Sequence, residues 1–204
     1  MYARSTTIMG NPGSIEAGII HVRDEVLPTV SAMDGCLGMS LVVDRETGRC
    51  IATTSWETEE AISASRGPVM SIRSRASEIL GGTPMVEEWE VAAMHRDHAS
   101  HDGCACRITW TRARDLDTTV DFWRNTLLSR FEAMDGFCSA SMLIDRAGSR
   151  TCGTLTFDSQ AALEASREEA AMIRETASRE VGVEFLDVAE FELAVGHLRL
   201  PELV

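Results

Sequence analysis

The chain has 204 residues, of which 44 % are hydrophobic and 25 % charged, and its formal net charge is −13. This composition is typical of a folded globular protein. Such an excess of acidic groups repels phosphate backbones and anionic lipids, so we expect neither a nucleic-acid nor a membrane partner. All nineteen cationic side chains are arginines.

The N-terminal residues 1–7 contain no apolar core of signal-peptide length, and nowhere do eighteen apolar residues run together. The six cysteines of a chain without an export signal indicate reduced thiols and not a disulfide framework. We therefore expect a cytoplasmic protein.

An internal duplication organises the chain. Residues 32–81 align without a gap to residues 133–182, with eighteen identities in fifty positions, and both segments open on Ala-Met-Asp-Gly. After a one-residue slip, residues 88–92 match residues 190–194. We predict a first repeat over residues 1–95, a linker over 96–104 and a second repeat over 105–204, each of ordinary domain size.

The predicted elements of each repeat begin with a strand, over residues 2–8 and 106–112, rich in β-branched and aromatic residues. Apolar residues at helical spacing then predict a helix from Ser14, which Pro28 would kink or shorten, and its mate from Asp117. Both helices end at Met-Asp-Gly, where Gly35 and Gly136 suit the left-handed position after a helix.

Two strands joined by a hairpin follow, beginning at residues 36 and 137 and ending at Trp56 and Phe157. Thr58 and Ser159 stand where a helix cap belongs, and the second helix continues to about residue 78 or 179. A last strand, over residues 85–93 and 184–195, completes each repeat.

The order β-α-β-β-α-β, present twice, predicts an α+β fold of two tandem ferredoxin-like units. Each unit has two helices on one face of an antiparallel sheet and leaves the other face bare. We expect the two sheets to pack into a pseudo-dimeric α+β barrel, because that packing buries both bare faces. A further homo-oligomer is left open.

The segment Ser55-Trp56-Glu57-Thr58-Glu59-Glu60-Ala61, followed by residues 66–69, resembles the dimeric α+β barrel superfamily and its antibiotic biosynthesis monooxygenase branch. The resemblance covers both repeats in topology, but in sequence only this segment and the Gly35 turn. It implies a pocket between sheet and helices for a small apolar or aromatic molecule, sometimes oxidised with oxygen and no other cofactor.

The haem-degrading members of that branch place an Asn on the first strand, and a Trp and a haem-ligating His on the second helix. The corresponding positions here are occupied by other residues, namely Thr6 or Thr109, Ser65 or Ser166, and Arg73 or Arg174. A guanidinium stays protonated and cannot ligate iron. Haem degradation in the manner of the branch is therefore not expected, and we expect no cofactor.

Repeated polar residues are the candidates for substrate binding: Arg4, Thr6, Ser65, Arg107, Thr109 and Ser166. Arg4 and Arg107 would clamp a substrate carboxylate, or would pair with Glu88 and Glu190 on the neighbouring strand. The pairing with these glutamates is the favoured interpretation. The sequence designates no catalytic residue.

The linker carries a second candidate site, made of His95, His98, His101, Cys104 and Cys106. Imidazole and thiolate are zinc ligands, and four of these would suffice. Cys-x-Cys is not the usual ligand spacing, and His95 has a repeat mate in His197, so the alternative is a solvated linker without metal.

Three functions remain open from the sequence. The leading hypothesis is a monooxygenase-like barrel protein that binds, and in the enzymatic case oxidises, a small apolar or aromatic molecule without metal or bound flavin. The second is a non-catalytic ligand-binding or stress-associated barrel protein. The third is zinc binding through the linker.

Overall fold

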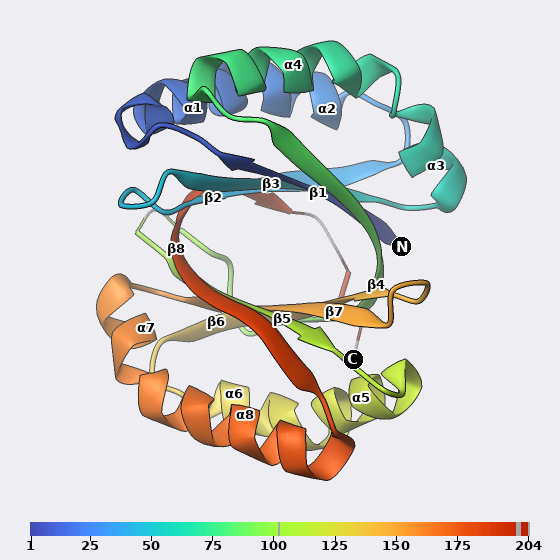
Figure 1. The fold of residues 1–204 in the computed structure, drawn as a ribbon, viewed down its shortest axis with the longest axis vertical. Coiled ribbons are helices and arrows are strands. Elements are labelled where there is room, and N and C mark those ends of the chain that lie inside the picture. The colour runs from blue at the N-terminus through green and yellow to red at the C-terminus, as the bar shows by residue number, and fades with distance from the viewer. Residues whose placement is uncertain (102, 199–200, 204) are drawn as a thin grey trace. The chain divides into compact units, whose positions relative to one another are not determined.

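A computed structural model describes residues 1–101, 103–198 and 201–203 and confirms the predicted α+β class (Figure 1). The elements of the first repeat are β1 (Tyr2–Met9), a 3₁₀ turn η1 (Pro12–Ser14), α1 (Ile15–His21), a π turn η2 (Val22–Val26), α2 (Leu27–Ser31), β2 (Cys36–Val43), β3 (Arg49–Trp56), α3 (Glu59–Ala64), α4 (Pro68–Leu80) and β4 (Pro84–Arg96). Those of the second are β5 (Ala105–Arg112), α5 (Leu116–Phe122), a π turn η3 (Trp123–Leu127), α6 (Leu128–Glu132), β6 (Phe137–Asp145), β7 (Arg150–Phe157), α7 (Gln160–Ala165), α8 (Arg167–Val181) and β8 (Glu184–Leu198). The predicted tandem of two β-α-β-β-α-β repeats is therefore correct.

The strands pair antiparallel in the same way in both repeats. β3 lies between β1 and β2, and β7 lies between β5 and β6. The two registers correspond: Arg4 is opposite Thr54 as Arg107 is opposite Leu155. The hydrogen-bonded strand order β1-β3-β2-β8-β5-β7-β6-β4 is closed, which is the strand connectivity of the predicted eight-stranded barrel.

Two compact units divide the chain differently from the sequence repeat. One unit holds residues 1–89 and the end of β8 from Leu193 on, and the other holds residues 90–192 and the C-terminal residues from Pro201 on. Ala194 and Val195, from the second repeat, accordingly pack in the core of the first unit. Ala92 and Ala93, from the first repeat, pack in the core of the second.

Each unit has its helices on one face of its sheet (Figure 1). The core between them contains the fully buried Trp56 in the first unit and the fully buried Phe157 in the second, and these side chains occupy matched positions. Their burial indicates that these matched aromatic residues serve packing.

The first helix of each repeat contains a π turn, which the sequence analysis did not predict. The helix passes through Pro28 and continues to Ser31, and the π turn lies just before, at Val22–Val26. The second repeat has its π turn at the matched residues Trp123–Leu127 without any proline nearby. Pro28 is therefore not the cause of the π turn, because the turn forms in its absence.

The second helix of each repeat is interrupted, where the sequence predicted one continuous helix. α3 ends at Ala64 before Ser65, and α7 ends at Ala165 before Ser166. Thr58 and Ser159 cap α3 and α7 as predicted, since their hydroxyls accept hydrogen bonds from the backbone N–H groups of Ala61 and Ala162. The helix predicted from Asp117 begins one residue earlier, at Leu116, and Asp115 is its cap, because the Asp115 side chain accepts the N–H groups of Asp117 and Thr118.

Gly35 and Gly136 adopt the predicted left-handed conformation, with φ of 74° and 72°. A Cβ atom at either position would also lie 2.7 Å from the Cβ of an alanine, Ala61 or Ala162. Both the backbone and the close approach of the following helix therefore require glycine here.

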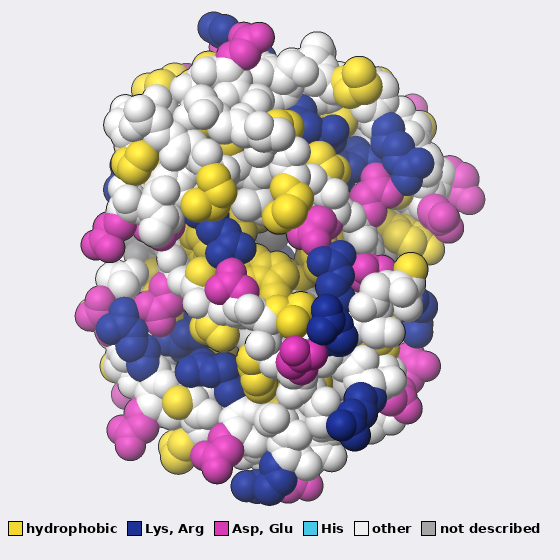
Figure 2. Space-filling model, viewed as in Figure 1, with side chains coloured by type: hydrophobic (Ala, Val, Ile, Leu, Met, Phe, Trp, Pro, Cys, Tyr) yellow, Lys and Arg dark blue, Asp and Glu magenta, His cyan; other side chains and the backbone are white. Residues whose placement is uncertain are grey.

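The charged groups are interspersed on the face drawn in Figure 2, where arginines lie beside acidic side chains. No helix of the described residues is long and apolar enough to cross a membrane.

Candidate ligand-binding site

A buried arginine joins sheet to helix in the second unit. Arg107 on β5 is 3 % exposed, and its Nη1 donates to the Oγ of Ser166 at 2.8 Å. Its Nη2 donates to the carbonyl oxygen of Leu163 at 2.9 Å and to Oε1 of Glu190 at 2.8 Å. Arg167 binds the other carboxylate oxygen of Glu190 at 2.6 Å.

The first unit repeats this network. Arg4 is 3 % exposed and donates to Ser65 at 2.7 Å, to the carbonyl oxygen of Ile62 at 2.6 Å and to Glu88 at 2.7 Å. Arg66 provides the second cation on the Glu88 carboxylate. The favoured interpretation of Arg4 and Arg107, pairing with the glutamate of the neighbouring strand, is what this geometry shows.

Ser65 and Ser166 occupy the breaks between helices for a chemical reason. The Ser65 hydroxyl donates to the carbonyl oxygen of Ile62 at 2.7 Å and accepts from Arg4. Ser166 does the same with Leu163 and Arg107. The sequence analysis considered Arg4 and Ser65 separately; their joint repetition in the second copy was the available signal that they act together.

Glu88 and Glu190 are held ionised by these networks. The hydrogen bond from Arg66 is the largest cause that lowers the pKa of Glu88, and burial opposes it. Burial raises the pKa of Glu190, but the hydrogen bonds from Arg167 and Arg107 outweigh it, so the pKa of Glu190 is lowered overall. Neither carboxylate is suited to be a general base near neutral pH.

A cavity of about 100 Å³ lies beside this network in the second unit. It is bounded by strands β5, β6 and β7 and by the helices, and most of its wall is apolar. Its lining residues are Arg107, Thr109, Thr111, Thr119, Phe122, Trp123, Leu127, Phe131, Met142, Thr151, Gly153, Thr154, Leu155, Ala170, Ile173, Arg174, Ala177, Val181, Val183 and Phe185. The π turn contributes Trp123 and Leu127, so the helical irregularity shapes the wall.

Arg174 on α8 is the second cation of this wall, and its situation differs from that of Arg107. It is half-buried, and among the described residues it forms no hydrogen bond or ion pair. Burial, followed by the charge of Arg107, lowers the pKa of its guanidinium, and Glu190 opposes this shift. The group remains charged, so its five N–H donors are available to an anion.

The first unit has a smaller cavity, of about 80 Å³, in the matched position. Its wall holds Arg73 where the second holds Arg174, and aliphatic Val22 and Val30 where the second holds Trp123 and Phe131. The second cavity is therefore the better site for an aromatic ring, because it offers aromatic faces for stacking.

Four of the six residues predicted to bind substrate line a cavity, and two do not. Arg4 and Thr6 line the first cavity, and Arg107 and Thr109 line the second. Ser65 and Ser166 lie outside both described linings, and their hydroxyls accept hydrogen bonds from Arg4 and Arg107. The sequence analysis placed Arg73 and Arg174 at the position of a haem ligand but did not count them as binding residues.

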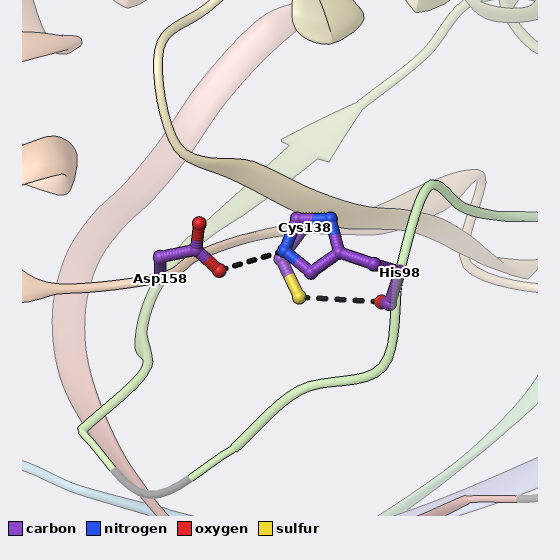
Figure 3. Close-up of side chains that lie close together, drawn as sticks. All are labelled: His98, Cys138 and Asp158. Carbon is purple, nitrogen blue, oxygen red and sulfur yellow. Dashed lines mark hydrogen bonds and ion pairs between the residues drawn. The ribbon is translucent and has the colours of Figure 1, made fainter.

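The predicted metal set does not converge on one point. The His95 ring stacks on Phe137, and its nitrogens face Glu132 and Glu202. Cys106 is buried against the hydroxyl of Thr156. The other three lie near residues of the second repeat that the prediction did not include: His98 with Cys138 and Asp158, and His101 and Cys104 with Asp158 (Figure 3).

The fold and the cavities define a class: ferredoxin-like α+β barrel proteins with a cavity between sheet and helices. Residues 1–67 match the family described as antibiotic biosynthesis monooxygenase. Uncharacterized protein Rv2557 of Mycobacterium tuberculosis (strain ATCC 25618 / H37Rv) is 52 % identical over 206 residues, covering 100 % of this chain and 92 % of that protein. Rv2558 of the same strain is 50 % identical over 207 residues, covering 100 % of this chain and 88 % of that protein. The chain belongs to the family of these two proteins.

Solved structures agree on the fold. A candidate monooxygenase from Lactobacillus acidophilus NCFM superposes with a TM-score of 0.73 at 8 % identity, over 97 % of this chain and 96 % of that one. An anthrone oxidase-like protein superposes with a TM-score of 0.65 at 16 % identity, over 94 % and 90 % of the two chains. At these identities the likeness establishes the fold alone, and an activity has to be inferred from the residues of the site.

Proposed function

We propose that this chain is a monooxygenase-like barrel protein that binds a small aromatic anion in the cavity of its second unit. The observation that carries the proposal is Arg174, a half-buried guanidinium in the wall of a largely apolar cavity that forms no hydrogen bond or ion pair with the described residues. A partly desolvated charge whose N–H donors have no partner in the protein costs free energy, and an anionic ligand would reduce that cost.

The size of the cavity limits the ligand. At about 100 Å³ the cavity is smaller than the apolar protein cavity of roughly 150 Å³ that accepts benzene, so we expect a ligand no larger than a single aromatic ring with a small anionic group. Trp123, Phe122 and Phe131 would contact the ring, and Arg174 would bind a carboxylate or phenolate oxygen.

Oxidation of the bound molecule with oxygen is the activity that the family name suggests. The described wall of the cavity contains no acid, histidine, cysteine or tyrosine, so it offers no general base. An oxygenation here would need a substrate that is already ionised, and Arg174 would stabilise that anion. The same absence favours the second candidate, non-catalytic binding.

Binding of a matched pair of probes tests the proposal. Benzoate and its neutral isostere benzamide are titrated at pH 7 against the fluorescence of the tryptophans and by calorimetry. We expect benzoate to bind about tenfold more tightly, a difference of about 1.4 kcal/mol, and Arg174→Met to abolish the preference. Arg179→Met, an exposed cation of the same helix, is the matched control and should change nothing.

Filling the cavity provides a second test. A Cβ atom added at Gly153 would meet only two backbone oxygens within 4 Å, both at 3.9 Å, and Gly153 lines the cavity, so we expect the side chain of Gly153→Leu to extend into the cavity. This variant should bind neither probe and should keep its thermal stability. Equal affinity of the wild type for both probes, or undiminished binding by Gly153→Leu, would refute the proposed site.

Oxygen consumption separates the two candidate functions. Oxygen uptake with a phenol that is ionised at the pH of the assay, above its rate of autoxidation and lost in Arg174→Met, would indicate oxidation. Binding of benzoate, together with no such oxygen uptake in the presence of ionisable phenols, would favour the non-catalytic protein.

A further inference from the structure

We propose that the second unit holds one zinc-class divalent cation through His98, His101, Cys104 and Cys138, with the carboxylate of Asp158 within reach of both imidazoles. The proposal is independent of the ligand cavity, because none of these five residues lines it. It differs from the set predicted from the sequence, which contained His95 and Cys106 and lacked Cys138 and Asp158.

The distances place the five side chains in two groups of three that share Asp158. The ligand atoms of His98, Cys138 and Asp158 lie within 4.8 Å of one another, and so do those of His101, Cys104 and Asp158. Asp158 Oδ1 is 2.7 Å from Nε2 of His98 and 3.4 Å from Nε2 of His101. The Cys104 and Cys138 thiols are joined by a hydrogen bond, which connects the two groups.

The backbone holds the histidine loop against the sheet. The N–H groups of Asp97 and His98 both donate to the carbonyl oxygen of Cys138, at 3.0 and 3.4 Å. The Cys138 thiol in turn donates to the carbonyl oxygen of His98 at 3.4 Å, and Figure 3 shows the His98 ring directed toward Asp158. The loop that carries His98 is thus fixed beside the start of β6.

The surroundings of the ligands are those of a metal site. Asp97 lies 2.8 Å from Nδ1 of His98, so it can hold the ring with Nε2 toward the cation, as second carboxylates commonly do. The Cys104 sulfur accepts the backbone N–H of His101 at 3.3 Å, an interaction that a thiolate strengthens. Cys104 and Cys138 are 1 % and 0 % exposed, so their sulfurs are shielded from water, and the side chains of His98, His101 and Asp158 form the exposed side of the site.

The chemistry of the donors selects the metal. Two sulfurs and two imidazole nitrogens form the Cys₂His₂ set of structural zinc sites, and magnesium and calcium prefer oxygen ligands. Burial is the largest cause that raises the pKa of the Cys138 thiol to about 12, and binding of a zinc ion would displace the proton of this thiol.

The first repeat shows that the fold does not require this cluster. The positions matched to Cys104, Cys138 and Asp158 hold Met1, Leu37 and Glu57, and the same strands form there. Packing alone is therefore satisfied by residues that have no thiol. The cluster is an addition to the second repeat and its linker, which points to a ligand.

Metal content of the full chain tests the inference. The protein is purified without chelator or affinity-tag metal, and zinc is measured by inductively coupled plasma mass spectrometry. We expect about one zinc per chain, and about two protons released per zinc when the metal-free protein is titrated at neutral pH. Cobalt substitution should give thiolate-to-cobalt charge-transfer absorption.

Single variants identify the ligands. Cys138→Ala and Cys104→Ala should each lose the stoichiometric zinc and the charge-transfer absorption, and Asp97→Asn should weaken zinc binding roughly 10- to 100-fold. Cys106→Ala removes an equally buried thiol two residues from Cys104. This variant should retain both the stoichiometric zinc and the charge-transfer absorption. Circular dichroism checks that each variant is folded.

Two results would overturn the proposal. One is a wild-type chain that neither retains zinc nor takes it up, with the same thermal stability with and without a chelator. The other is a Cys104–Cys138 disulfide in freshly purified protein, detected by mass spectrometry without reductant, since that would assign the two thiols a redox role.

Discussion

At the scale of single residues, two arginines of one cavity wall have opposite roles because their partners differ. Arg107 is saturated by Ser166, a carbonyl oxygen and Glu190, so it joins sheet to helix. Arg174 has no hydrogen-bonding partner among the described residues and is available to a ligand. Residue type is therefore a poor guide to role here, and the contacts decide it.

Removal of the buried arginine should destabilise the fold. In Arg107→Met the Glu190 carboxylate, whose side chain is 25 % exposed, loses its buried partner, and we expect a loss of about 3 kcal/mol in the free energy of unfolding. Arg146→Met, at an exposed ion pair, should cost less than about 1 kcal/mol. Urea unfolding followed by circular dichroism measures both, and equal costs would contradict the assigned role.

The same network predicts an acid dependence. The pKa of Glu190 is lowered in the folded chain, so its contribution to stability is fully present above the unfolded value of about 4.3. That contribution is lost as the pH falls through the lower, folded value. The stability difference between wild type and Glu190→Gln should therefore shrink between pH 6 and pH 3 in urea titrations, and a difference that grows would show the opposite shift.

At the scale of elements, both repeats keep the same irregularities although their side chains differ. The π turns at Val22–Val26 and Trp123–Leu127, and the helix breaks at Ser65 and Ser166, occur at matched positions. Each irregularity places side chains on the cavity or on the arginine network. They belong to the architecture of the repeat and not to a local sequence accident.

The turn after α6 offers a test of one such constraint. Gly136→Ala would place a Cβ at φ 72° and 2.7 Å from the Cβ of Ala162, and we expect a loss of about 2 kcal/mol in unfolding free energy. Gly67→Ala is the control, because nothing lies within 4 Å of an added Cβ and its φ is −66°. Thermal unfolding of Gly136→Ala/Ala162→Gly should recover only part of the loss, since the backbone strain remains.

At the scale of the whole molecule, each compact unit needs strand residues from both sequence repeats. The end of β8 supplies Ala194 and Val195 to the core of the first unit, and the end of β4 supplies Ala92 and Ala93 to the core of the second. Neither core is therefore complete within one repeat, although the repeats are clear in the sequence.

Unfolding should accordingly be a single cooperative transition. Loss of one unit withdraws β4 or β8 residues from the other, so we expect one calorimetric peak whose van't Hoff and calorimetric enthalpies agree. Val195→Ala, in the second repeat, should lower the melting temperature of that single peak. Two resolved transitions, with only one shifted by Val195→Ala, would show that the units unfold independently.

The sequence by itself determined the duplication, the α+β class and the order of elements, because each of these follows from local periodicity, turn residues and internal identity. It determined the left-handed glycines Gly35 and Gly136 and the caps Thr58 and Ser159 for the same reason. Only the tertiary structure decided which polar residues meet: Arg4 with Ser65, Arg107 with Ser166, and His98 with Cys138 and Asp158. Such contacts join residues that lie 40 to 61 positions apart in the chain, and the sheet register sets these pairings, which no local pattern encodes.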